Sequence, residues 1–535
     1  MKKLIFLFIA SFMLIIMPIS NANFNCGSCN CECKATSKTF FNVRPPYQSA
    51  TPEKDSMFYD RMDFREDGRG GAVQIALFGG QSTDSNKLAT YFTPFCKRCL
   101  VVKECDDRQG VDIMAHHFNI LTQKGVDCSI CCTTTSCVNE AFESRISFCP
   151  SISVVGLGLT YQQNVSKLLF ADDEIRYNVW LEISAPITRV ETSVCMSEDI
   201  ISDGDGAYSS TDTDMQFFAS MRDAFNQSAW KYGKIRSKSC VKWGIADIEV
   251  KLGLHREQGI VAYGGYIGAL VPTGNRPCAE YVFEPIVGHN GHWGFTKGGY
   301  VGIETWKNEA ETKNLRYLNF MQFLYLFSRD EMRSFDLKYK PWSRYMKVYR
   351  NKEEAIIAAN ATDDVTRLMF GTPGINLFTQ CVNVSPGLAF SMINAWLFSG
   401  LRWSIEAGFN FYARQAECIQ ICGTFEKDAV LKARCGNGVA NRDIEINDDN
   451  NECIGAVTRY TSSNYEAAII EKSDLDLESA SHPGLISNTF YAAAGYRWDD
   501  KEHPMILSAG LAYEWGQENY ILDRWTFWCK YSVSF

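Results

Sequence analysis

Apolar and polar residues alternate along the carboxy-terminal end of the chain. Between Trp525 and Phe535 apolar side chains fill every second position, and only Trp528 departs from the rule. A period of two is typical of a β-strand with one apolar face. Eleven residues at about 3.3 Å per residue reach about 36 Å, which spans a hydrocarbon core of about 30 Å when the strand is tilted. The pattern therefore predicts a membrane-spanning strand.

The same alternation recurs upstream, and it is cleanest over residues 402–414, where apolar side chains oppose charged and amide ones. Single-chain bacterial barrels favour even strand numbers. We expect about 12 strands, within a range of about 10 to 16. The candidate strands are residues 71–80, 111–121, 152–162, 176–184, 246–254, 260–270, 297–305, 315–327, 384–397, 402–414, 490–498, 505–516 and 525–535.

The fold class that follows is all-β, a single antiparallel transmembrane β-barrel with long cysteine-bearing loops and a few short helices. Helical periodicity occurs at residues 215–230 and 352–369. These helices could fold into the barrel or decorate its outside. Aromatic residues cluster at strand ends, as Tyr513 and Trp515 do, where membrane interfaces lie.

The polar faces of the candidate strands predict the lining of the barrel interior. Charged and amide side chains cost little there if the interior is wet, whereas in a dry core each would need a partner. Such a lining would set the size and ion preference of a pore. The candidate lining residues are Asp247, Glu249, Lys251, Arg402, Glu406, Asn410, Arg414, Arg497 and Glu514.

The first residues predict export. Two lysines, an apolar stretch over residues 4–19 and the small-x-small triplet ending at Ala22 are typical of a cleaved signal peptide over residues 1–22. Its removal changes the net charge from −9 to −11, because it holds two lysines and no acidic residue. A negative chain disfavours nucleic acid as a partner. A cysteine-rich segment over residues 23–70 and the barrel over residues 71–535 would follow.

Twenty-one cysteines in an exported chain favour disulfides. The count is odd, so at least one thiol is free or pairs with another chain. The first cluster of four could instead bind zinc or an iron–sulfur cluster, although its single-residue gaps disfavour a chelating turn. The disulfide candidates are Cys26, Cys29, Cys31, Cys33, Cys96, Cys99, Cys105, Cys128, Cys131, Cys132 and Cys137.

No catalytic or cofactor motif stands out. The chain lacks a Gly-x-Ser-x-Gly elbow and a complete phosphate-binding loop. His289 and His292 could share a metal only on a helix, which Gly288, Gly291 and Gly294 disfavour. We expect a loop that directs polar side chains into the barrel, no metal, no cofactor and no enzymatic activity.

The last residues resemble the assembly signal of outer-membrane barrels, in which the final strand ends on an aromatic residue. Tyr531, Val533 and Phe535 carry the resemblance, although Trp528, Lys530 and Val533 depart from the longer form of the signal. The leader, the cysteines and the single barrel together resemble the major outer-membrane porins of chlamydiae and other intracellular bacteria. That resemblance implies passive diffusion of small hydrophilic solutes and disulfide cross-linking within the envelope.

The function that these observations favour is a porin-like channel in the outer membrane of a Gram-negative bacterium. Its expected partners are outer-membrane lipid, the barrel-assembly machinery, and a second copy or disulfide-linked envelope proteins. Three alternatives stay open: a structural or adhesive surface protein that uses the barrel as an anchor, a membrane hydrolase, and a soluble cysteine-rich β protein. Conductance separates the first of these from a channel.

Overall fold

The computed structural model describes most of the chain after residue 36. The described residues are 37–48, 50–57, 70–94, 97–103, 113–114, 142–169, 177–202, 220–338, 341–345, 347–349, 351, 353–354, 357, 371–423, 430–431, 470–498, 503–516 and 519–535. All of them belong to one compact unit, Ala35–Phe535.

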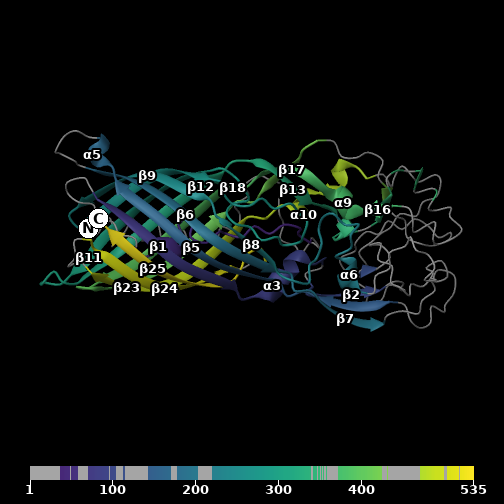
Figure 1. The fold of residues 1–535 in the computed structure, drawn as a ribbon, viewed down its shortest axis with the longest axis horizontal. Coiled ribbons are helices and arrows are strands. Elements are labelled where there is room, and N and C mark those ends of the chain that lie inside the picture. Colours follow the sequence, from purple (N-terminus) through teal and green to yellow (C-terminus); the bar gives the residue numbers. More distant parts are fainter. Residues whose placement is uncertain are drawn as a thin grey trace, which may run out of the picture. The chain divides into compact units, whose positions relative to one another are not determined.

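Twelve antiparallel strands close into a barrel (Figure 1). The first strand pairs with the last, since Ala72 lies opposite Ser534, and β5 closes the ring by pairing with both β1 and β6. In ring order the strands are β1 (Gly71–Ser82), β25 (Arg524–Ser534), β24 (Met505–Gly516), β23 (Leu485–Trp498), β19 (Trp403–Arg414), β18 (Gly387–Ser399), β12 (Asn314–Leu326), β11 (Gly294–Lys307), β10 (Val261–Val271), β9 (Ile248–Gln258), β6 (Asn178–Ser193) and β5 (Ser151–Asn164).

The closed barrel confirms the predicted fold class and strand number. Twelve of the thirteen candidate strands overlap the twelve barrel strands. The prediction for residues 111–121 was wrong where it can be checked, because β3 (Ile113–Met114) pairs in parallel with β2 (Cys99–Lys103) outside the barrel. The same small sheet contains β4 (Glu143–Ser147) and β7 (Ser197–Ser202).

One wall of the barrel is interrupted at Asp247. Strand β6 pairs with β9 along its first half and with β8 (Cys240–Ile245) along its second half. Between β8 and β9, the fully buried Asp247 carboxylate accepts the main-chain N–H groups of Gly274 and His289, at 3.2 and 2.7 Å. The observed strand β9 therefore begins two residues later than the predicted strand 246–254. Asp247 does not pair in the sheet because its carboxylate binds the main chain of a loop.

The outer face of the barrel is apolar all the way round. Each of the twelve barrel strands exposes at least one large apolar side chain, such as Leu77, Leu511 and Phe527. Trp528, which broke the alternation in the sequence, faces inward and is 1% exposed. Its ring lies against Gly510, where a Cβ atom would be 2.2 Å away, so a glycine on β24 makes room for it.

Short elements continue from neighbouring barrel strands. We call β13 (Arg329–Ser334), β17 (Thr379–Ser385) and β20 (Cys418–Ile421) the cap sheet; they directly follow β12, precede β18 and follow β19. The other elements are β14 (Asp336–Leu337), β15 (Lys347–Tyr349), β16 (Thr372–Pro373), β21 (Val430–Leu431), β22 (Leu475–Asp476), α2 (Pro52–Asp55), α3 (Ser85–Phe92), α5 (Ser166–Leu169), α6 (Met221–Ala224), α9 (Gly374–Phe378), α10 (Leu477–Ala480), η4 (Ser343–Tyr345) and η6 (Lys472–Asp474).

The predicted helix over residues 215–230 is shorter than expected. Of residues 215–230, only Met221–Ala224 form a helix within the described part 220–230, and residues 352–369 lie almost wholly outside the described residues. None of the helices in the described ranges is both long and apolar enough to span a membrane.

Candidate functional site inside the barrel

The residues that precede β1 lie inside the ring of strands. We call residues 37–48 and 50–57 the N-terminal segment. Lys54 Nζ lies 2.7 Å from Glu249 of β9 and 3.4 Å from Glu182 of β6. The main-chain N–H of Met57 donates to Glu406 of β19 over 2.6 Å. Five strands separate β6 from β19 on either side of the ring, so a short segment can touch both only from within.

Arg44 fixes the N-terminal segment to the wall formed by β18, β19 and β24. Its guanidinium donates to Asn410 Oδ1 at 2.8 Å and Ser391 Oγ at 3.1 Å. It also lies 3.9 Å from Glu514. Charge and hydrogen bonds together hold this buried cation, since hydrogen bonds to charged groups are stronger than neutral ones.

Tyr47 fixes the segment to β1 and β5. Its hydroxyl accepts a hydrogen bond from Gln74 Nε2 at 2.6 Å and lies 3.1 Å from Thr160 Oγ1. The ring stacks on Phe78 at a centroid distance of 5.5 Å. Gly158 lies beneath the ring, and a Cβ atom there would be 2.3 Å from it. The Tyr47 ring can therefore occupy this position only because residue 158 is a glycine.

Four charged side chains form a cluster around Lys54. Lys251 Nζ lies 3.4 Å from Glu182 and 3.2 Å from Glu249, which also bind Lys54, and all four side chains are at most 3% exposed. Two cations thus face two carboxylates. On the opposite side Lys530 of β25 donates to the main-chain oxygens of Lys54 and Ser56.

Aromatic side chains fill the neighbouring part of the interior. Trp180, Tyr266 and Tyr300 form a buried cluster that packs against Phe320. Lys251 Nζ lies 4.9 Å above the Tyr266 ring, within range of a cation–π interaction. The charged cluster is therefore enclosed by protein on this side as well.

Seven of the nine predicted lining residues are buried, and each contacts the N-terminal segment or another buried side chain. Arg497 is half-buried at the end of β23. Arg402 was wrongly assigned: it is exposed and donates to the Tyr496 hydroxyl at 3.2 Å, because it lies in the turn before β19 rather than on the strand. The buried seven are Asp247, Glu249, Lys251, Glu406, Asn410, Arg414 and Glu514.

The partner of these polar groups differs from the expected one. The sequence suggested water, but Glu249, Glu406 and Asn410 are bonded to Lys54, Met57 and Arg44 of the N-terminal segment. A charged wall is thus matched by a charged segment.

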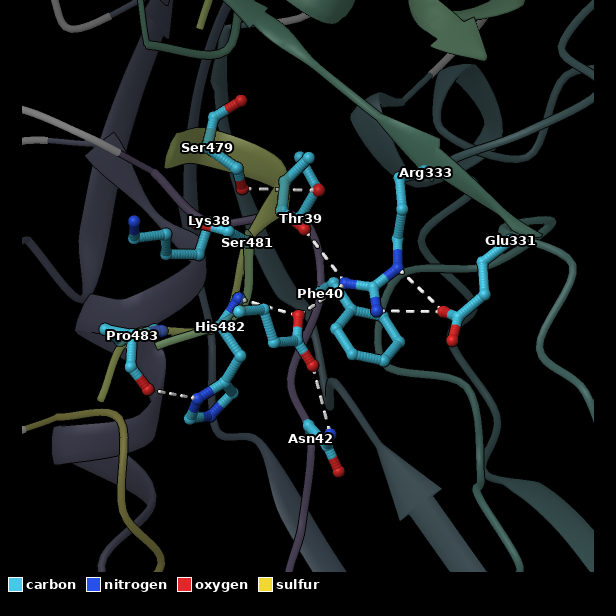
Figure 2. A network of polar contacts seen from close by, with 12 residues as sticks. Lys38, Thr39, Phe40, Asn42, Glu331, Arg333, Ser479, Ser481, His482 and Pro483 are labelled. Atoms are coloured by element: carbon cyan, nitrogen blue, oxygen red, sulfur yellow. Dashed lines mark hydrogen bonds and ion pairs between the residues drawn. The ribbon is translucent and has the colours of Figure 1, made fainter. Parts of the chain in front are cut away.

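A second polar network lies where the N-terminal segment meets the cap sheet (Figure 2). Arg333 of β13 donates to Glu331 at 2.8 Å and to Glu417 at 3.1 Å. Its guanidinium lies over the ring of Phe40, 3.2 Å from the centroid. Glu417 in turn accepts a hydrogen bond from Asn42 Nδ2 at 3.1 Å. Phe40 and Asn42 thus attach the segment to the cap sheet.

The charges of this network determine which of its groups are ionised. Burial raises the pKa of Glu417, but the positive charges of Arg333, His482 and Arg414 outweigh burial and hold that pKa below its ordinary value. Burial and the charge of Arg414 lower the pKa of His482 well below its ordinary value. Within this network Glu417 is therefore ionised and His482 is neutral.

His289 and His292 are bound to carboxylates. His289 Nδ1 lies 2.8 Å from Asp247, and His292 Nε2 lies 2.7 Å from Glu331. The two histidines thus join the interrupted wall to the cap sheet. Each of the two histidines thus has its own acidic partner.

The residues of the predicted assembly signal lie where the last strand, β25, pairs with the first strand, β1. Phe535 and Gly71 exchange two main-chain hydrogen bonds of 2.9 Å. Tyr531 and Phe535 are each 40% exposed on the apolar outer face, and Val533 lies opposite Val73 of β1. Recognition by assembly machinery stays a prediction.

The predicted disulfides fall mostly outside the described residues. Of the candidates only Cys99 is described, and it is exposed with a free thiol. The other free thiols within the described ranges are Cys149, Cys195, Cys240, Cys278, Cys381, Cys422 and Cys529.

The N-terminal segment was the feature that the sequence analysis missed. It has no alternation of apolar and polar residues, so it is unlike a strand, and Pro45 and Pro46 cannot donate main-chain hydrogen bonds to a sheet. The available signal was the presence of Arg44, Tyr47 and Lys54 before the first strand, in a chain whose predicted barrel interior contains several carboxylates.

Comparison with known proteins gives only distant similarities. No family model and no curated protein sequence matches the chain. An outer membrane channel of Pseudomonas putida F1 superposes with a TM-score of 0.35 at 10% identity, over 87% of this chain and 96% of that one. The transport unit of the autotransporter AIDA-I of Escherichia coli gives 0.30 at 7%, over 91% and 99%. A Pseudomonas aeruginosa FadL homologue gives 0.27 at 8%, over 94% and 97%.

Every one of these TM-scores is below 0.5, so no property of these proteins is transferred to this chain. None of the three is a chlamydial porin, and that resemblance stays a prediction.

Proposed function

We propose that this protein is an outer-membrane channel for small hydrophilic solutes, which the N-terminal segment closes in the state described here. The outer face supports the membrane location. All twelve barrel strands expose large apolar side chains, and an apolar band of that extent is unfavourable in water but matches hydrocarbon.

The observation that supports a channel is the charged wall beneath the N-terminal segment. Glu182, Glu249 and Lys251 would be a poor choice for a permanently sealed core, because apolar packing of the same volume is often at least as stabilising as a buried ion pair. If the segment withdraws, the same side chains face water and lose nothing by hydration. The wall is therefore suited to both a closed and an open state.

The class of solute follows from the charges on both sides of the interior. Glu182, Glu249 and Lys251 line β6 and β9, and on the opposite side Glu406, Glu514, Arg524 and Lys530 are buried on β19, β24 and β25, with Arg524 Nε 2.7 Å from Glu514. Charged groups of both signs favour small hydrophilic solutes over apolar ones, and their positions would set ion preference.

Conductance across a planar lipid bilayer tests the proposal. The full-length protein is compared with the double variant Arg44→Ala/Lys54→Ala, which removes two cations that fasten the N-terminal segment. We expect rare openings for the unmodified protein and more frequent or longer openings for the variant. Lys167→Ala, at an exposed position on α5, is the matched control and should behave like the unmodified protein.

The contrary result is a double variant that keeps the fast, heat-sensitive gel band of a folded barrel and yet conducts no current. That result would favour the alternative, a surface protein whose filled barrel serves as an anchor. A filled interior is compatible with both, so the current, not the fold, decides between them.

A further inference from the structure

Two pairs of cysteines lie opposite each other where the ladders of paired strands end. In the ladder of β17 and β20, Val382 pairs with Ile421, so the next opposed positions are Cys381 and Cys422. The main-chain N–H of Cys422 donates to the Cys381 oxygen at 2.9 Å, so the ladder continues through this pair. Hydrogen-bonded antiparallel pairs have Cα atoms about 5.5 Å apart, within the range for a disulfide.

The side chains of this pair point to the same place. Both sulfur atoms and a carboxylate oxygen of Asp330 lie within 4.8 Å of one another. Cys422 Sγ is 3.6 Å from Asp330 Oδ1. Both cysteines are outside the barrel strands, on the cap sheet.

The second pair extends the ladder of β5 and β6. Ser151 lies opposite Ser193. Continuing this antiparallel register by two residues places Cys149, which precedes β5, opposite Cys195, which follows β6. The main-chain N–H of Cys149 donates to the Val194 oxygen at 3.2 Å, so the two chains stay together there. Cys149 is near enough to Cys195 to contribute to the raised pKa of the Cys195 thiol.

We propose that Cys381 forms a disulfide with Cys422, and Cys149 with Cys195, in the mature protein. An exported chain encounters an oxidising compartment, where opposed thiols are converted to disulfides. In neither pair do the two cysteines belong to the same cluster in the sequence, since the partners are 41 and 46 residues apart. The inference does not depend on the channel function.

The chemistry requires an oxidant, which we take to be the disulfide of a thiol–disulfide oxidoreductase. One cysteine loses its proton and attacks that disulfide, which forms a mixed disulfide and releases a thiolate of the oxidant. The second cysteine then loses its proton and displaces the oxidant, which leaves as a dithiol. Two protons and two electrons pass from the cysteine pair to the oxidant.

The surroundings of the thiols favour an enzymatic oxidant over spontaneous oxidation. Burial and the neighbouring Asp330 carboxylate raise the pKa of Cys422. Burial and the neighbouring Cys149 raise the pKa of Cys195. A raised pKa leaves less of the attacking thiolate at neutral pH, so uncatalysed formation is slow.

A disulfide between Cys381 and Cys422 would also fix the cap sheet next to the N-terminal segment. β20 begins one residue after Glu417, which binds Arg333 of β13 and Asn42. Cross-linking β17 to β20 therefore holds Glu417 near the residues that it bonds.

Peptide mapping of the full-length protein tests the inference. The protein is extracted from membranes, its free thiols are alkylated under denaturing conditions without reductant, and tryptic peptides are identified by mass spectrometry. We expect residues 368–402 linked to residues 415–427, and residues 146–167 linked to residues 190–222. Cys529, exposed on the outer face of β25, should be alkylated.

Cys418 provides the matched control, because it lies on β20 and in the same tryptic peptide as Cys422. Cys418→Ser should keep the link to residues 368–402, and Cys422→Ser should abolish it and leave Cys381 alkylated. The heat-sensitive gel band shows that each variant folds.

The two proposed disulfides are tested independently of each other. Alkylation of both members in the unmodified protein, or links to other cysteines, would overturn the inference for that pair. A metal ion released by a chelator, together with alkylated Cys381 and Cys422, would instead identify Asp330 and the two sulfurs as a metal site.

Discussion

Lys54 shows how a single residue links the N-terminal segment to the barrel wall. It shares Glu182 and Glu249 with Lys251, so two positive and two negative side chains balance within the interior. Removing one member of a buried ion pair costs about 3–5 kcal/mol, because an unpaired charge is left away from water. The balance of charge matters more here than any one distance.

Lys54→Met should therefore destabilise the barrel. We expect the free energy of unfolding to fall by about 3–5 kcal/mol. The compact gel band should then convert to the slow band at a lower temperature. Adding Glu249→Gln restores charge balance and should recover part of the loss. If Lys54→Met converts at the same temperature as Lys167→Met, the buried cluster does not hold the segment.

His482 should make the stability depend on pH. Burial and the charge of Arg414 lower its pKa well below 6.5 in the folded state; Lys38 and Glu417 are the other charged groups that act on it. As pH falls below about 6.5, the unfolded chain binds a proton that the folded chain does not, so stability decreases. The temperature of the gel-band transition should drop between pH 7.5 and 5.5.

His482→Gln should flatten that dependence over the same pH range. Glu417 does not interfere, because its lowered pKa places its protonation below its ordinary value of 4.5. An equal slope in the unmodified protein and His482→Gln would show that His482 is not the group responsible.

At the scale of elements, the N-terminal segment depends on the space that β5 leaves for it. Gly158 lies against the rigid ring of Tyr47, and a methyl group at that position would be 2.3 Å from the ring. Stacking on Phe78 restricts movement of the Tyr47 ring away from this position.

Gly158→Ala should displace Tyr47 and raise the open probability in bilayer recordings. Gly265→Ala on β10 is the matched control, because the nearest atom there is 3.4 Å from the new Cβ and no rearrangement is needed. Identical recordings from the two variants would mean that the contact between Tyr47 and β5 does not restrain opening.

The barrel strands were predictable because lipid on one face and a polar interior on the other impose a period of two. That period appears in residues 402–414, and β19 spans Trp403–Arg414. The period does not mark where a strand turns, so Arg402 was placed on the strand although it lies in the preceding turn.

The interior was predicted only in part. Alternation identified Glu249, Glu406 and Asn410 as inward-facing, but it could not reveal what they face. Their partners, Lys54, Met57 and Arg44, come from a segment without periodic order, and the pairing depends on contacts across more than 190 residues of sequence. Such long-range complementarity leaves no local pattern.

At the scale of the molecule, an apolar outer face and a charged, occupied interior are combined in one barrel. The outer face supports the membrane location, and the interior supports a channel whose closed state is maintained by its own N-terminal segment. The proposal of a channel closed by its own chain rests on that segment lying within the ring, between β6 and β19.

The position of the segment can be measured directly with a photoreactive residue. Val43 borders a small cavity together with Ile152 and Val154 of β5 and Val190 of β6, so an aliphatic diazirine side chain fits there. Illumination of the folded protein in membranes should link position 43 to residues 146–167 or 190–222. The same probe at the exposed Leu477 of α10 should not. Absence of these links from position 43 in a heat-sensitive, folded population would contradict the account.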